Sequence, residues 1–477
     1  MKILKLIVTG LMVLNAAIVY GVPVGSSSAT TALDVQSDDK VVVVGYATDG
    51  ATSDTKFLVA RYTTDGDLDT TFGTDGVTLT TSGPGKQAQA VVIQSTDNKI
   101  VSTGNSSVDS LVVRYNTDGT FDTSFGTDGI VTLALGDTIA TTSVAFVDTG
   151  TNKIVVAGGV VISGAFRVVL AQLNLDGTLD TGFGTGGFVT TAIGDSSVAH
   201  ALAVQTDGKL VVAGTTTTSG VNQFFVARYN ADGTLDTGFG TTGITITAIG
   251  TNDQAFTLAI QPSDGKILVG GFSDGKFVIA RYTTAGVLDT GYGTSGATTT
   301  TIGSNAYIRD IAVQADGKAV VAGVSDSFFT LARYTTAGAL DTSTFGTSGI
   351  VITPIGAADI ANTVGIQSDD KIVAAGTSDN SSVIVRYSAA GVLDATYGFN
   401  GITIAPAGTN VSPGTICHIW EEQAQNTNGG TFTAGAWQTR TLNRIVGNLG
   451  NVSLTANQFE LQPGIYQIVM NRLPHQH

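Results

Sequence analysis

Cysteine is almost absent from this sequence of 477 residues, since Cys417 is the only one and no disulfide can form within the chain. A small domain stapled by disulfides is therefore excluded, whereas export to an oxidising compartment is not, because a large β core needs no staples. Histidine occurs four times, and His200 has no second histidine or cysteine near it in sequence. This spacing disfavours a transition-metal site.

Charged residues are also few, at 13% of the chain, and the formal net charge is −15. A nucleic-acid surface is disfavoured, because it needs clustered Lys and Arg. The sequence holds 8 prolines against 61 glycines, and the abundance of Gly and Thr favours turns and β-strands over helices. Phosphate-binding loops and a plausible serine triad are missing. We therefore predict no catalytic and no cofactor-binding residues, and a protein that is not an enzyme.

Residues 1–21 resemble a secretory signal peptide. Lys2 and Lys5 precede an apolar run that ends in small residues, and cleavage is expected after Gly21. A lone N-terminal membrane anchor is the alternative, although the run is shorter than the ~20 apolar residues that a span prefers. Either reading predicts an exported protein, secreted or at the cell surface, with no other membrane span and with residues 22–29 as a linker.

One stretch, "NADGTLDTGFGTTG" from Asn230, recurs with variations seven times along the chain. The aromatic residue of a Phe-Gly or Tyr-Gly pair marks each copy, and successive marks are 52 to 58 residues apart: Phe72, Phe125, Phe183, Phe239, Tyr292, Phe345 and Tyr397. A period near fifty residues is typical of propellers and solenoids.

Between two such corners the sequence predicts four strands. In the clearest copy they cover Ile244–Ala248, Phe256–Gln261, Lys266–Gly270 and Lys276–Tyr282, and an Asp-Gly hairpin turn joins the second to the third. Seven units of four strands are expected to stack as blades around an axis. The predicted fold is therefore all-β, a seven-bladed β-propeller over residues 30–408.

Two frames for closing the ring remain open. The extra strand "GITIAP", Gly401–Pro406, could complete the first blade and lock the ring, or a blade could begin at "ALDVQ", from Ala32, and need no such closure.

Charged residues recur at fixed places in the units. A lysine follows each hairpin turn and is interpreted as an exposed strand-start residue that discourages edge pairing, rather than as part of a ring of cations. Six units end their fourth run in Arg-Tyr, and each arginine is expected to pair with a corner aspartate. The lysines are Lys40, Lys99, Lys153, Lys209, Lys266, Lys318 and Lys371.

The corner itself offers two aspartates and is the one candidate for a calcium site. Calcium needs about six to eight oxygen ligands, but the first aspartate is replaced by Ala285, Ala337 and Ala390 in the last three corners. We therefore predict no metal site and leave calcium open only for the first four corners. A structural role is expected instead: the corner glycine is left-handed, the aromatic anchors the loop between blades, and the second aspartate accepts backbone N–H groups. Asp236→Ala would then cost about 1 kcal/mol.

Phrases such as "DGK…V.AG" and "ARYN.DG.LD..FG" resemble the delta-60 repeats of bacterial β-propellers, over Ala32 to Pro406. That resemblance implies the architecture and no catalytic residues. Residues 409–477, with "GGTFTAGAWQTRTLN" from Gly429 and "L.PG.Y.I" from Leu461, resemble the start of a TNF- or C1q-like jelly-roll domain. This second resemblance implies a partial β-domain and a homotrimer, although about seventy residues are few for a jelly roll.

The expected function is that of an exported, non-enzymatic binding or scaffold protein, with an extracellular protein or glycan as partner. A calcium-dependent, carbohydrate-binding adhesin is the alternative. An enzyme acting on polysaccharide is a more remote reading, because it would need an acidic or histidine cluster that converges on the channel of the propeller.

Overall fold

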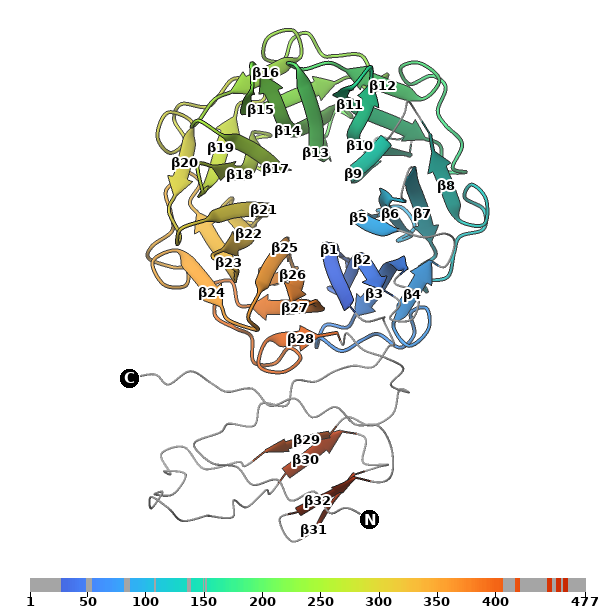
Figure 1. Cartoon of the computed structure of the whole chain (residues 1–477), viewed down its shortest axis with the longest axis vertical. Helices are drawn as coiled ribbons and strands as arrows, with labels where there is room; N and C mark the ends of the chain where they lie inside the picture. Colours follow the sequence, from blue (N-terminus) through green and yellow to red (C-terminus); the bar gives the residue numbers. More distant parts are fainter. Residues whose placement is uncertain are drawn as a thin grey trace.

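The computed structural model describes residues 27–48, 54–80, 86–106, 109–134, 139–148, 150 and 152–405, and four short strands further along the chain. Residues 27–405 form a ring of seven four-stranded antiparallel sheets (Figure 1), which confirms the predicted all-β, seven-bladed propeller. All regular elements in the described ranges are strands, and no helix long and apolar enough to cross a membrane occurs in them.

The seven blades follow one another along the chain. The first four contain β1 (Ser27–Val35), β2 (Val41–Thr48), β3 (Thr55–Tyr62) and β4 (Val77–Thr80); β5 (Gln87–Ile93), β6 (Ile100–Asn105), β7 (Ser110–Tyr115) and β8 (Ile130–Leu133); β9 (Ile139–Val147), β10 (Lys153–Ile162), β11 (Ala165–Leu173) and β12 (Phe188–Thr191); β13 (Ser196–Val204), β14 (Leu210–Thr218), β15 (Val221–Tyr229) and β16 (Ile244–Thr247). The last three contain β17 (Asp253–Ile260), β18 (Ile267–Ser273), β19 (Lys276–Tyr282) and β20 (Ala297–Thr300); β21 (Ala306–Val313), β22 (Ala319–Ser325), β23 (Phe328–Tyr334) and β24 (Ile350–Thr353); β25 (Asp359–Ile366), β26 (Ile372–Ser378), β27 (Ser381–Tyr387) and β28 (Ile402–Ile404).

Within each blade the strands are paired in chain order, so that the first strand lies at the central channel and the fourth at the rim (Figure 1). The four strands predicted around the fifth unit are all present. The second of them begins earlier than expected, at Asp253, and the first, β16, is the outer strand of blade four rather than part of blade five.

The ring is closed without exchange of a strand. β28 pairs with β27 in blade seven, and blade one is complete with its own β1 to β4. The expectation that Gly401–Pro406 completes the first blade is therefore wrong, and the frame that needs no closure strand is the one observed.

Since blades seven and one share no strand, hydrogen bonds and apolar contacts hold them together. The Ser28 N–H donates to the Asn380 carbonyl at 2.9 Å, and the Asn362 side-chain amide donates to the Thr30 carbonyl at 2.8 Å. Buried apolar side chains of the two blades also form one shared cluster, which includes Tyr397. The junction is thus built like the other six.

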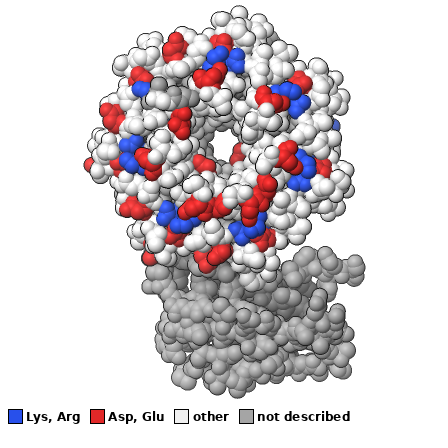
Figure 2. Space-filling view, turned by 180° about the vertical axis from the view of Figure 1, so that it is seen from behind, with Lys and Arg blue, Asp and Glu red and all other residues white. Residues whose placement is uncertain are grey.

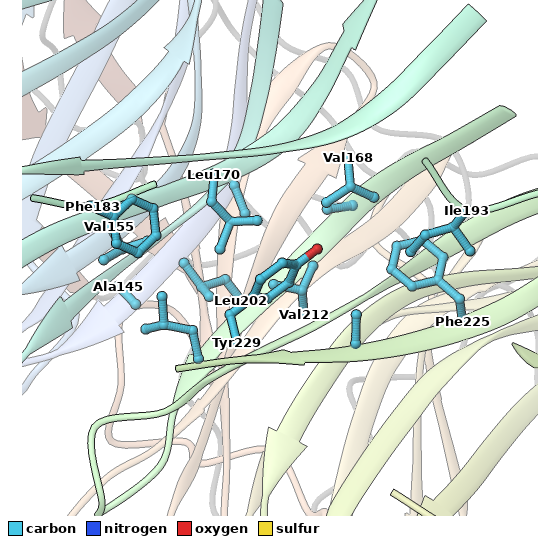
Figure 3. Packing of buried hydrophobic residues seen from close by; sticks show 14 of the residues in the cluster. Ala145, Val155, Val168, Leu170, Phe183, Ile193, Leu202, Val212, Phe225 and Tyr229 are labelled. Atoms are coloured by element: carbon cyan, nitrogen blue, oxygen red, sulfur yellow. The ribbon is translucent and has the colours of Figure 1, made fainter. Parts of the chain in front are cut away.

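The hydrophobic core consists of seven clusters, each formed by the facing sides of two neighbouring blades. Figure 3 shows the cluster between blades three and four, where Val155 and Leu170 pack near Val212, Phe225 and Tyr229. Burying one such large side chain stabilises the fold by about 1.5–3 kcal/mol. Both faces of the second and third strands are covered, which explains why those strands are continuous apolar runs.

A β-bulge interrupts the innermost strand of every blade and leaves one residue out of the pairing: Thr31, Gln89, Thr142, His200, Phe256, Arg309 and Asn362. The strand beside the bulge carries a glycine in every blade: Gly45, Gly104, Gly158, Gly214, Gly271, Gly323 and Gly376. A Cβ atom on Gly214 would lie 2.0 Å from the Val198 carbonyl oxygen. The bulge therefore requires the glycine, because the two backbones approach too closely for a side chain.

The four short strands beyond the propeller form two antiparallel pairs: β29 (Cys417–Trp420) with β30 (Arg444–Gly447), and β31 (Val452–Thr455) with β32 (Gln458–Leu461). The rest of 409–477, which carries the resemblance to a jelly-roll domain, lies outside the described residues, as does the predicted signal peptide 1–21.

The glycine beside the bulge generates a prediction about stability. Gly214→Ala should lower the free energy of unfolding by about 3 kcal/mol, the upper end of the usual cost of overpacking, because its Cβ would collide with the Val198 carbonyl. Gly238→Ala is the control, since its Cβ would meet only the end of the Asp236 side chain at 3.3 Å, and Thr71 holds that corner position in blade one. Urea unfolding of both variants measures the difference, and equal losses would contradict the requirement.

Candidate functional site

The second corner aspartate is the centre of a cluster of charges. In blade four, Asp236 Oδ2 lies 2.8 Å from both Lys209 Nζ and Arg228 Nε, and Oδ1 accepts the Gly238 N–H at 3.1 Å. The Arg228 guanidinium also lies over the ring of Phe239, 4.6 Å from its centre. The predicted arginine pairing and the predicted backbone bond of the aspartate are therefore both confirmed.

Five other blades repeat the arginine pair: Arg61–Asp69, Arg114–Asp122, Arg281–Asp289, Arg333–Asp341 and Arg386–Asp394. Blade three has Gln172 in place of the arginine and keeps only Lys153 beside Asp180, at 3.0 Å. The seven hairpin lysines are 22% to 34% exposed, and each lies within 4.0 Å of a corner aspartate. The lysines therefore form ion pairs, instead of only discouraging edge pairing as the sequence analysis expected. Figure 2 shows positive groups next to negative ones around the ring.

Each corner is also hydrogen-bonded to the next corner through the backbone. The Gly240 N–H donates to the Ala285 carbonyl at 2.8 Å, and the Gly184 N–H donates to the Asp232 carbonyl at 2.9 Å. The other five pairs are Gly73 with Asp118, Gly126 with Asp176, Gly293 with Ala337, Gly346 with Ala390 and Gly398 with Asp65. Because the link uses the carbonyl of the first aspartate position, alanine serves there as well as aspartate.

The corner glycine and the aromatic have the roles predicted for them. Gly286 has a φ of 80° and lies so close to the ring of Phe239 in the preceding blade that a Cβ would be 2.6 Å from a ring carbon. Phe239 itself is fully buried between blades four and five. The corners therefore hold neighbouring blades together.

Both corner carboxylates have partners within the protein. Asp232 Oδ1 accepts the N–H of Thr234 at 2.9 Å and its hydroxyl at 2.7 Å, while Asp236 faces two cations. In the described part of the chain no group of three or more His, Cys, Asp or Glu side chains is placed to hold a metal ion. The corners thus give no observation that points to a ligand.

The channel wall is where the blades differ from one another. In blades one, three and seven a small polar side chain at the bulge donates to a backbone carbonyl of the next blade: Thr31 to Ala88 at 2.8 Å, Thr142 to Ala199 at 2.7 Å and Asn362 to Thr30 at 2.8 Å. At these three positions the side chain completes the contact between innermost strands.

Blades four, five and six have large side chains at the same position. The ring centres of His200 and Phe256 are 5.7 Å apart, and those of Phe256 and Tyr307 are 6.3 Å apart. The guanidinium carbon of Arg309 lies 4.8 Å from the centre of the Tyr307 ring and 5.4 Å from that of Phe256. We call His200, Phe256, Tyr307 and Arg309 the channel cluster.

Arg309 brings an unbalanced positive charge to the channel cluster. No described residue accepts a hydrogen bond from its guanidinium or forms a salt bridge with it, and its Nε is buried without a partner. Burial, followed by the charge of Arg309, lowers the pKa of His200 to about 4. At neutral pH the imidazole is therefore uncharged, and the channel cluster carries a single positive charge.

The neighbouring carboxylate does not balance that charge. Asp310 accepts hydrogen bonds from the Thr257 and Thr363 hydroxyls and from the N–H groups of Ile311 and Val364, at 2.8 to 3.0 Å. Burial raises its pKa, against the effect of these donors. Asp310 thus joins the innermost strands of blades five, six and seven and has a structural role.

An open pocket of about 220 Å³ adjoins the channel cluster between blades four and five. His200 lines it together with Ser197, Thr215, Thr217 and Gln254. The hydroxyl oxygens of Ser197 and Thr215 are buried and have no hydrogen-bond partner. Unpaired buried hydroxyls are costly, so the pocket wall contains polar groups that the protein itself leaves without a partner.

Sequence reasoning considered His200 only as a metal ligand and missed Phe256, Tyr307 and Arg309. A signal for three of these residues was present, because the bulge lies nine to eleven residues before the hairpin lysine in every unit. Comparing the units at that position would have shown Thr or Asn in some and large side chains in others.

A ring of seven equivalent sheets held together at repeated corners defines a seven-bladed β-propeller built from one repeat. The family described as "Domain of unknown function (DUF5122) beta-propeller" matches residues 36–72, 96–125, 150–183, 205–239, 263–292, 314–343 and 367–397, one segment in each blade. No match to a curated protein was found.

Solved structures with a similar fold include a binding protein and an enzyme. Sqt1 from Chaetomium thermophilum, bound to the N-terminus of the ribosomal protein L10, is 15% identical, with a TM-score of 0.47 over 77% of this chain and 86% of that chain. Puromycin hydrolase is 13% identical, with a TM-score of 0.50 over 84% of this chain and 58% of that chain. At such low identity these similarities concern the fold alone.

The charge cluster at the corner predicts which aspartate matters for stability. Asp236→Ala should lower the free energy of unfolding by about 2–3 kcal/mol, more than the 1 kcal/mol expected of a turn cap, because it leaves Arg228 without a carboxylate and Lys209 with only Asp207, 3.9 Å away. Asp232→Ala should change it by less than about 0.5 kcal/mol, since three corners carry alanine there. Urea unfolding compares the two, and a similar loss in both would show that the charge cluster is unimportant.

The corner carboxyls also predict how stability depends on pH. A hydrogen bond from Lys209 lowers the pKa of Asp236 from 3.8 to about 2, with help from the Gly238 N–H and the charge of Arg228. The pKa values of the other six second aspartates are lowered as well. A lowered pKa stabilises the folded state above the unfolded value, and this stabilisation is lost as pH falls.

The melting temperature should therefore decrease steeply between about pH 5 and pH 2, and less steeply in the variant Asp236→Asn. Asp34, whose pKa burial raises to about 6, and Asp310 act in the opposite direction, since a raised carboxyl pKa favours folding at lower pH. These two carboxyls are outnumbered by the seven second corner aspartates, whose pKa values are lowered. A melting temperature that rises throughout this acid range would contradict the prediction.

Proposed function

We propose that this protein is an exported, non-enzymatic binding protein whose propeller holds an extracellular ligand at the inner wall of blades four to six. The pocket chemistry favours a glycan over a protein as that ligand. In this proposal residues 1–21 direct export, and residues 409–477 form a β-domain that can trimerise and present several propellers together. These two parts rest on sequence resemblance.

One observation carries the proposal: the channel cluster departs from the pattern that the ring itself needs. At the bulge a threonine or asparagine suffices to join neighbouring innermost strands, as in blades one, three and seven. His200, Phe256 and Arg309 make no hydrogen bond of that kind to a described residue, and they follow one another in three adjacent blades. Side chains that the fold does not require, gathered beside a pocket, support ligand binding.

The size and lining of the pocket support a glycan. Its volume of about 220 Å³ is below the roughly 300–1,000 Å³ of pockets that enclose drug-sized ligands, so it suits a single small unit of a longer chain. Hydroxyl and amide groups line it, and aromatic rings lie next to it. Such a lining can bind both the hydroxyl groups and the apolar face of a sugar ring.

The same wall gives little support to catalysis. One histidine lies there, and the two carboxylates on innermost strands that have raised pKa values, Asp34 and Asp310, accept backbone N–H groups. General acid–base catalysis by paired groups needs them near one reacting bond. A polysaccharide-active enzyme is therefore disfavoured as the proposal for this fold.

Glycan binding by the full chain tests the proposal. On an array of defined glycans, we expect at least one class to bind and to lose about tenfold or more in affinity in the triple variant His200→Thr, Phe256→Thr, Arg309→Thr, which restores the simpler bulge residue. The control variant Ile246→Thr, Ile352→Thr alters exposed apolar side chains on outer strands and should bind normally. Circular dichroism and melting temperature establish that both variants are folded.

Three outcomes would change the conclusion. Absence of binding to every glycan, or unchanged binding by the triple variant, would overturn the proposed site. Binding that is lost with a chelator and restored by calcium would support the calcium-dependent adhesin. New reducing ends released from a bound polysaccharide would show that the protein is an enzyme.

A further inference from the structure

We infer that the channel cluster contains a carboxylate subsite for an acidic sugar, with Arg309 as the group that binds the carboxylate. This inference rests on the proposed function and names the class of glycan. It predicts that a uronic acid unit lies at Arg309 while a neighbouring sugar unit occupies the pocket lined by His200 and Gln254.

Arg309 differs from every other arginine of the described propeller residues. Six arginines at the corners are paired with aspartates: Arg61, Arg114, Arg228, Arg281, Arg333 and Arg386. A seventh, Arg167, donates to the Asp195 carbonyl. The guanidinium of Arg309 has no acceptor among the described residues, although acidic side chains outnumber basic ones in this chain. Among the arginines of the described propeller, Arg309 is therefore the one available to an acceptor from another molecule.

Aromatic rings hold the guanidinium in a suitable orientation. Arg309 lies over Tyr307 and Phe256, at 4.8 Å and 5.4 Å from the ring centres. Stacking occupies the face of the guanidinium and leaves the N–H groups on its edge for a partner. A carboxylate fits that edge, because two parallel N–H···O bonds match its geometry. The Nε is buried, so the two terminal nitrogens of the guanidinium are the donors left for such a carboxylate.

Groups that bind sugar hydroxyls lie within reach on the other side of Phe256. Ser197 and Thr215, whose hydroxyls are unpaired, line the pocket together with Thr217 and Gln254. His200 is neutral and can both donate and accept a hydrogen bond. The ring of His200 is 5.7 Å from that of Phe256, so the pocket and the arginine are separated by one aromatic residue. This distance fits adjacent units of an oligosaccharide rather than one small anion.

Calorimetric titration of the full chain with defined oligomers tests the inference. The probes are a short oligogalacturonide, its methyl ester, a short oligoglucuronide and poly-glutamate. We expect at least one uronic acid oligomer to bind, and about 10-fold to 100-fold weaker binding of the ester, which lacks the negative charge. Arg309→Gln should abolish the preference for the acid over the ester. Arg167→Gln, the matched control at another half-buried arginine, should preserve it.

The outcomes separate this inference from the proposed function. If neutral glycans bind at the channel cluster and uronic acid oligomers do not, the acidic-sugar subsite is wrong and the proposed function stands. If no glycan binds, both are wrong. Equal binding of poly-glutamate would overturn the sugar class, and a preference for the acid that persists in folded Arg309→Gln would overturn the role of Arg309.

Discussion

The structure depends on one interaction, the contact between consecutive corners. A glycine N–H of each corner donates to a carbonyl of the next, and in six blades an arginine lies over the buried aromatic ring. Since the pattern continues from blade seven to blade one, where Gly398 donates to Asp65, the ring closes without a shared strand. Backbone groups make this link, so the first aspartate can be replaced by alanine. The second aspartate is needed because its carboxylate neutralises the nearby lysine and arginine.

A second constraint is the bulge at the channel, which requires a glycine beside it but allows the bulged residue itself to vary. The glycine beside each bulge allows two backbones to approach closely, as at Gly214 and the Val198 carbonyl, and the bulge then places one residue of every blade in the wall. That residue needs only to be compatible with the contact to the next blade. The fold therefore fixes the position while tolerating Thr31 in one blade and Arg309 in another, and a binding site can develop there at little cost to the ring.

The proposed function is accordingly connected to the departures from repetition. The corners, where the hairpin lysines and six arginines meet the second aspartates, are explained by the stability of the ring, and their carboxylates are engaged by the protein. The channel cluster has the opposite character, with an arginine that lacks an acid and a pocket with unpaired hydroxyls. An uncharged His200 beside Arg309 keeps a single positive charge at the wall of a strongly acidic chain.

The sequence by itself determined the number of blades, the four strands of each and the pairing of arginine with the corner aspartate, because turn residues, strand runs and charges recur at a readable period. It did not decide how the ring closes, since β28 could be assigned to either of two blades until the sheets were seen. Only the tertiary structure brought together Phe256 and Arg309, which lie in different repeats. Their meeting depends on the rotation between blades and on a bulge that short-range patterns do not reveal, so the candidate site belongs to the ring as a whole.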